Sequence, residues 1–365
     1  MEITAANPQH KRRQPASYLN KIKPLAMVLA AVIAMAFAPN AAAANLIDEP
    51  RTLVPMGNTV GISLKADGVM VVSVPDTCSD GKSPSPAKAA GMKPGDIITR
   101  IGASRVTSGD ELKRALAAVD GTSVAVLVSR DGAAVQLNLT PHAQENGNHT
   151  LGVMVRDGIN GIGTVTYVDP ASGEYGALGH SVSDNETGLI LPLRTGEITK
   201  TSVTSVTKGQ PGTPGQLRGI DNTGADIIGS ITENSEHGIF GVMAQPEAAR
   251  DALPAADDSE LHTGDAVILS NVSGSEVREY KIEISRVYSG AESDSRSMLV
   301  TVKDPELIAQ TGGIVQGMSG SPIIQDGKLV GAVTHVLIGN PEKGYGVSIS
   351  KMLDMADDQK LNLAA

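Results

Sequence analysis

Short segments in which apolar and polar residues alternate make up most of the chain. Between residues 50 and 140 they include VGISL, GVMVVSV, DIITRI, SVAVLVS and AVQLNLT, separated by turn residues. Residues 108–119 differ, because Leu112, Leu116 and Val119 recur there at helical spacing. The pattern therefore predicts a small β-rich domain with one helix over residues 50–140.

The same strand pattern returns after Leu151 and continues almost to the end of the chain. Its segments are GTVTYV, GLILPL, TSVTSV, DIIGSI, GDAVILS, YKIEISRVY, SMLVTV, SPIIQ, LVGAVTHV and YGVSI. Many short strands with little helix predict an antiparallel barrel or sandwich over residues 151–365. Residues 141–150 are polar and rich in turn residues, which predicts a linker between the two domains.

Residues 1–45 have the pattern of an export signal. Several Lys and Arg residues precede an apolar run from Leu25 to Ala38, and small residues follow from Ala41 to Ala44. The run is shorter than the ~20 residues that span a bilayer comfortably. We therefore expect an exported protein whose leader is either a cleaved signal peptide or a retained membrane anchor.

Composition excludes several classes of function. The 365-residue chain has a net charge of −10, two Phe, six Tyr and no Trp, which disfavours a nucleic-acid partner. Its one cysteine, Cys78, cannot form an intramolecular disulfide. No His, Cys and Glu residues cluster at metal-ligand spacing, so we expect neither a metal nor another cofactor.

One stretch of the first domain carries a specific resemblance. The sequence SPAKAAGMKPGDIITRIGASRVTSGDEL resembles the PDZ domain of envelope proteases. The resemblance implies that Thr59, Val60, Gly61 and Ile62 form the loop that binds the C-terminal carboxylate of a peptide, which then adds as a strand. The alternative is that Gly61 only begins a strand.

The segment GMSGSP, residues 317–322, predicts a nucleophilic serine. Gly317 and Gly320 allow backbone conformations that other residues resist, so the N–H groups of Gly317 and Ser319 can converge as an oxyanion hole. The segment resembles the nucleophile loop of trypsin-like serine proteases. That resemblance implies that LVGAVTHV, which follows, lines the primary specificity pocket.

The catalytic base is expected among the seven histidines. His180, in GEYGALGHSVSD, enters a turn, as does the base at the edge of the first barrel in trypsin-like proteases. His335 is the alternative, although its place on the strand behind the nucleophile suits a role in shaping the substrate pocket. The others lie in the leader, the linker or exposed turns: His10, His142, His149, His237 and His262.

Two longer blocks extend the resemblance. YGALGHSVSD and DPELIAQTGGIVQGMSGSPIIQDGKLVGAVTHV resemble peptidase family S55, the stage IV sporulation protein B family of spore-forming bacteria. The family implies Ser319 as nucleophile, His180 as base and Asp304 as the carboxylate that orients the base. Asp304 lies close before Ser319, whereas this carboxylate usually comes earlier, and it could instead cap a helix. The remaining candidates for this carboxylate are Asp184, Asp226 and Asp265.

The resemblance also implies an architecture and a role. We expect a mainly β chain with a PDZ domain followed by a trypsin-like double-barrel protease domain. The implied enzyme is a serine endopeptidase that cleaves itself and a membrane-bound regulator, so that a sigma-factor precursor is processed in the mother cell. It would act at the membrane or between the forespore and mother-cell membranes. Alternatives are an envelope quality-control protease and a PDZ-based binding protein with an inactive barrel.

Overall fold

The computed structural model describes residues 51–219, 226–244, 250–289 and 296–364. About half of these residues lie in antiparallel strands, as predicted. The predicted leader, residues 1–45, lies outside the described residues. Within the described ranges, no helix combines the length and apolarity that crossing a membrane requires.

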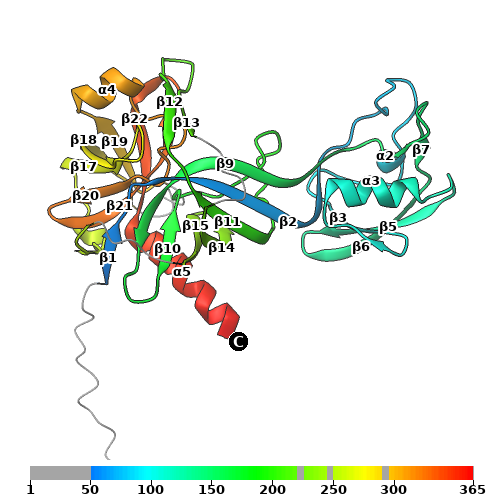
Figure 1. The fold of residues 1–365 in the computed structure, drawn as a ribbon, viewed down its shortest axis with the longest axis horizontal. Coiled ribbons are helices and arrows are strands. Elements are labelled where there is room, and N and C mark those ends of the chain that lie inside the picture. The colour runs from blue at the N-terminus through cyan, green and yellow to red at the C-terminus, as the bar shows by residue number, and fades with distance from the viewer. Residues whose placement is uncertain (1–50, 220–225, 245–249, 290–295, 365) are drawn as a thin grey trace, which may run out of the picture. The chain divides into compact units, whose positions relative to one another are not determined.

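Two long strands organise the chain. β2 (Thr59–Ser73) and β9 (Met154–Val168) each have 15 residues and pair antiparallel from the Thr59↔Thr164 pair to the Ser73↔Met154 pair (Figure 1). The start of β2 and the end of β9 share one apolar core, whereas Val69 and Val71 belong to another. The chain between these strands therefore forms a lobe inserted between two strands of a barrel.

The inserted lobe contains a short sheet and two helices. Helix α3 buries Leu112 and Leu116, as its spacing predicted, and the Ser108 side chain caps it by accepting from the Glu111 N–H. The predicted linker contains a small hairpin of its own, in which His142 pairs with Thr150. The elements are α2 (Pro86–Ala89), β3 (Ile97–Ile101), β4 (Ser104–Arg105), α3 (Gly109–Ala117), β5 (Val124–Arg130), β6 (Ala133–Leu139), β7 (His142–Ala143) and β8 (His149–Thr150).

The first barrel begins before the lobe. Its strands follow the order β9-β10-β15-β14-β11-β2, and the pairing of β2 with β9 closes the ring. The predicted start of the first domain at residue 50 therefore differs from the structure, because residues 52–66 contribute to this barrel. The remaining strands of the barrel and its edge are β1 (Thr52–Pro55), β10 (Glu174–Ala177), β11 (Leu193–Lys200), β14 (Ile227–Ser235), β15 (Gly238–Met243) and β16 (Leu253–Pro254).

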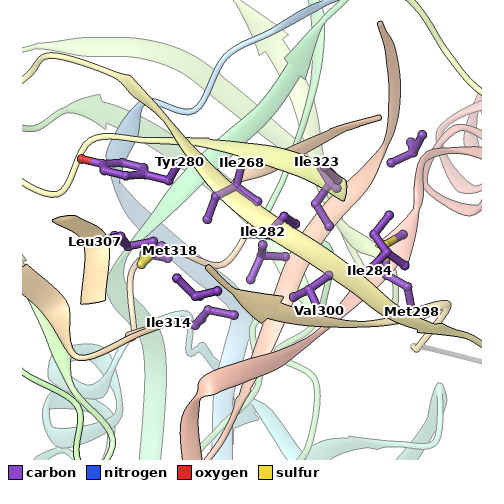
Figure 2. Packing of buried hydrophobic residues seen from close by; sticks show 14 of the residues in the cluster. Ile268, Tyr280, Ile282, Ile284, Met298, Val300, Leu307, Ile314, Met318 and Ile323 are labelled. Carbon is purple, nitrogen blue, oxygen red and sulfur yellow. The ribbon is translucent and has the colours of Figure 1, made fainter. Parts of the chain in front are cut away.

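The second barrel closes in the order β17-β18-β19-β22-β21-β20. Alternating buried and exposed positions along its strands give the barrel an apolar interior. Along β18, Tyr280, Ile282 and Ile284 point inward between exposed or half-buried residues. Figure 2 shows these side chains packed with Ile268, Val300 and Ile323. The strands are β17 (Gly264–Ser270), β18 (Arg278–Val287), β19 (Met298–Val302), β20 (Pro322–Gln325), β21 (Lys328–Leu337) and β22 (Asn340–Ser348).

The predicted double-barrel fold is thus confirmed. A two-stranded ribbon and three helices complete the described chain. These elements are β12 (Val203–Thr207), β13 (Gln216–Gly219), η2 (Asp258–Glu260), α4 (Pro305–Thr311) and α5 (Ile349–Ala364).

Candidate active site

Ser319 lies in a tight loop between α4 and β20. Gly317 and Gly320 have φ angles of 99° and 95°, a region that favours glycine. Between them the Met318 side chain is buried in the core of the second barrel (Figure 2), and its N–H donates to the Val315 carbonyl. The buried Met318 anchors the loop, and the two glycines turn the chain so that Ser319 remains half-exposed.

The predicted oxyanion donors are available. Within the described part of the chain, neither the Gly317 N–H nor the Ser319 N–H donates to another protein group. Buried backbone donors are nearly always paired, so two neighbouring unpaired N–H groups in a built loop suit an anionic oxygen supplied by a substrate. The role of Gly317 and Ser319 as oxyanion donors stays a prediction.

The hydroxyl of Ser319 is held by the neighbouring strand. Its Oγ donates a hydrogen bond to the Thr334 carbonyl on β21 at 2.6 Å. To attack a carbonyl carbon, Ser319 has to turn this proton toward a base instead. In the observed conformation the Ser319 proton therefore points toward the Thr334 carbonyl.

His180 reaches the same strand from the first barrel. Leu178 and Gly179 have φ angles of 68° and 70°, and these left-handed residues turn the chain at the end of β10. A Cβ added at Gly179 would lie 3.0 Å from the Thr334 Cγ2 and 2.9 Å from the Val347 Cγ1. Glycine thus allows this turn to approach the second barrel closely, and His180 follows it directly.

The surroundings of His180 suit a general base. Its Nδ1 lies 2.8 Å from the Ser181 carbonyl oxygen. Since a carbonyl oxygen can only accept, Nδ1 carries the proton and Nε2 keeps its lone pair. Burial lowers the pKa of His180 below its usual 6.5, and the bond to Ser181 offsets part of that change. The imidazole is therefore neutral at neutral pH.

His335 lies on β21, one residue beyond Thr334, and its ring centroid is 4.6 Å from that of His180. His335 is exposed, yet partial desolvation lowers its pKa, and the charges of His180 and Arg296 lower it further, to about 4. The structure therefore brings both candidate bases to the strand that holds the Ser319 hydroxyl. Of these two histidines, only His180 has a hydrogen bond to Nδ1 within the described residues that fixes its tautomer.

Asp304 does not orient His180 in this structure. It is the N-cap of α4, where its Oδ1 accepts from the N–H groups of Glu306 and Leu307. Its Oδ2 accepts from the Lys281 N–H at 3.3 Å. The predicted contact between Asp304 and His180 is absent from the described residues. The His180 Nδ1 bonds to the Ser181 carbonyl, and the Asp304 carboxylate accepts from backbone N–H groups. Helix capping, the alternative weighed from the sequence, is the role that the geometry shows.

The other three aspartates do not take this place either. Asp184 is buried; its Oδ1 closes a turn by accepting from Thr187, and its Oδ2 lies 2.5 Å from the Arg156 Nε. These backbone and side-chain partners hold its pKa below the usual value against the effect of desolvation. Asp226 precedes β14 and Asp265 lies on β17, both exposed.

Sequence reasoning missed Thr164, which joins the loop of Ser319 to the turn before His180. Its N–H donates to the Ser319 carbonyl and its Oγ1 to the Gly317 carbonyl, both at 2.8 Å. Its own carbonyl accepts from the Leu178 N–H at 3.2 Å. The sequence pattern that could have indicated Thr164 is GTVTYV, in which Thr164 and Thr166 alternate with apolar residues. Both threonines are fully buried in the structure.

The predicted carboxylate-binding loop is wrong in this structure. Thr59, Val60, Gly61 and Ile62 are not a loop but the start of β2. One edge of this segment pairs with β9, and the other pairs with β11 through Val60, Gly61 and Ile62. A peptide can add only to an unpaired strand edge. Because both of its edges are paired with other strands, this segment of β2 cannot bind a peptide by strand addition.

Comparisons with known proteins agree with the geometry. The family described as SpoIVB peptidase S55 matches residues 147–353, and the PDZ domain family matches residues 57–140. No curated protein gives a significant match. Among solved structures, the inactive form of the Rv3671c protease of M. tuberculosis H37Rv is 14% identical over 53% of this chain and 81% of its own, with a TM-score of 0.31. The HtrA-type protease AlgW with a decapeptide is 10% identical over 58% and 54%, with a TM-score of 0.32.

Proposed function

Because the chain belongs to the SpoIVB peptidase S55 family, we propose that this serine peptidase is the exported endopeptidase of a sporulation signal. It cleaves itself and then a membrane-bound regulator, so that a sigma-factor precursor is processed in the mother cell. The leader over residues 1–45 carries it across the cytoplasmic membrane, to a site at the membrane or between the two membranes. The PDZ domain supports a protein substrate in general.

The meeting of both barrels at Thr334 carries the proposal. The Ser319 hydroxyl bonds to the Thr334 carbonyl, and the turn before His180 packs on the same residue. When substrate enters, Ser319 turns its proton toward Nε2 of His180 and attacks the scissile carbonyl carbon. The N–H groups of Gly317 and Ser319 then bind the oxyanion, and His180 returns the proton to the leaving amine.

An active-site probe tests the chemistry. A fluorophosphonate should label the wild-type chain but not Ser319→Ala, because only an activated serine reacts. Ser321→Ala is the matched control, since Ser321 lies two residues away with a buried hydroxyl that lacks a partner in the described structure. Labelling that survives in Ser319→Ala, or is lost in Ser321→Ala, would contradict the assignment.

The signalling role requires a second experiment. In a sporulating cell, Ser319→Ala should block maturation of the sigma-factor precursor, whereas Ser321→Ala should allow it. The purified wild-type chain should also shorten with time on a gel, and Ser319→Ala should not. Rapid cleavage of many unfolded proteins by the wild-type chain would favour envelope quality control instead.

A further inference from the structure

A wide cleft in the described part of the chain lies beside the loop that carries Ser319. It has a volume of about 750 Å³, against about 210 and 230 Å³ for two others. Its floor is the sheet of β9, β2 and β11, and β13 forms one wall. All of these strands come from the protease fold rather than from the inserted helices.

The cleft opens directly next to the oxyanion hole. Leu217 and Ile162, which both line it, surround Gly317: a Cβ added there would lie 3.0 Å from Leu217 and 3.3 Å from Ile162. In addition, the Leu217 N–H donates to the Gln316 carbonyl at 2.8 Å. A peptide whose scissile carbonyl sits in the oxyanion hole therefore places its neighbouring residues within reach of this cleft.

The floor of the cleft is polar. Cross-strand pairing aligns Asn160, Ser63 and Glu197 in one row across β9, β2 and β11. The next row has Gly61 at its centre, where a Cβ would lie only 2.4 Å from the Thr199 Oγ1. Glycine thus lets the Thr199 hydroxyl lie close over the β2 backbone, and this polar lining suits polar side chains better than large apolar ones.

The charges of the cleft favour an anionic ligand. Lys65 lies on the floor two residues beyond Ser63, and Arg218 lies on the wall strand β13. Within the described residues, neither cation forms an ion pair, and Glu197 is the carboxylate of the lining. Two unpaired cations against one carboxylate give the cleft a positive balance.

We propose that this cleft is a specificity site that binds an acidic side chain of the peptide substrate, close to the scissile bond. Lys65 and Arg218 hold the carboxylate, and the hydroxyls and amide of the floor bind its neighbours. The inference rests on the proposed peptidase function, because it deepens the same site.

Two pools of random decapeptides test the proposal, one carrying Asp and Glu at fixed positions and the other Asn and Gln. The wild-type chain should cleave the acidic pool about tenfold faster, and Lys65→Glu or Arg218→Glu should abolish that ratio. Glu197→Gln should raise the ratio, because it removes the opposing charge. Lys113→Glu, on the exposed face of α3, is the control and should leave it unchanged.

Binding separates this proposal from the peptidase assignment. Fluorescein-labelled pools can be titrated against Ser319→Ala, with and without Lys65→Glu, because binding needs no turnover. If the acidic pool binds more tightly than the amide pool and this difference depends on Lys65, the proposed specificity site is supported even when no cleavage occurs. Equal binding of both pools, or a preference for the acidic pool that survives Lys65→Glu, overturns it. Absence of both cleavage and fluorophosphonate labelling in the wild-type chain counts against the peptidase function alone.

Discussion

The imidazole rings of His180 and His335 lie 4.6 Å apart, centroid to centroid, at an interplanar angle of 38°. Desolvation disfavours the charged form of each ring, and the charges of His180 and Arg296 disfavour it further in His335. The pKa of each is accordingly lowered, that of His335 to about 4. Near neutral pH both rings are therefore neutral, which leaves His180 able to accept the proton of Ser319.

Replacing the two rings one at a time should separate their roles. His180→Ala should lower kcat by a factor of about 10⁴ to 10⁶, because members of a catalytic set act as a unit. His335→Phe keeps the ring packing and should retain most activity. Single-turnover cleavage of one peptide by both variants is the measurement. An inactive His335→Phe beside an active His180→Ala would make His335 the base.

The dependence of cleavage on pH follows from the lowered pKa of His180. A base works only when neutral, so kcat/KM should fall as the solution is acidified through the pKa of His180. Since that pKa lies below 6.5, the acid limb should also lie below pH 6.5. A rate profile from pH 4.5 to 8 measures it. A limb centred above pH 6.5 would show that His180 is stabilised in its charged form.

Stability should decrease with acidification for a related reason. The unfolded chain protonates His335 near pH 6.5, whereas the folded chain does so only near pH 4. Between these values the unfolded state binds more protons, so the free energy of unfolding falls as pH falls. Urea denaturation at pH 7 and pH 5 should show a smaller loss for His335→Phe than for the wild-type chain. Equal losses would assign the effect to other groups.

The sequence predicted what local patterns determine. Its glycines around Ser319 predicted a tight loop, and its alternation of apolar residues predicted antiparallel strands in a barrel or sandwich, whereas the double barrel was implied by the family resemblance. The sequence could not show that β2 and β9 run through lobe and barrel together, because strand pairing joins residues far apart in the chain. The same limit explains two other differences. Asp304 matched a family position but its carboxylate serves α4, and Thr164 acts on a loop more than 150 positions away.

The role of Asp304 is decided by one substitution. Asparagine caps helices nearly as well as aspartate, so Asp304→Asn should keep both stability and turnover close to wild type. Asp304→Ala should cost about 1 kcal/mol of stability, with activity preserved in the folded fraction. Thermal denaturation and steady-state cleavage are measured together. A loss of about 10⁴ in turnover for Asp304→Asn would instead place the carboxylate in the catalytic set.

Thr164 offers the sharpest test of how the oxyanion loop is held. Thr164→Val keeps the shape of the side chain but leaves the buried Gly317 carbonyl without its donor, a defect of about 1–3 kcal/mol. Because that carbonyl belongs to the loop that presents the oxyanion donors, kcat should fall about 10- to 100-fold while KM changes little. Thr164→Ser keeps the hydroxyl and should recover most of the rate. Thr99→Val, which removes a hydroxyl bound to the Leu127 carbonyl in the inserted lobe, controls for a general loss of stability. Equal kcat values for Thr164→Val and Thr164→Ser would show that the hydroxyl does not position the loop.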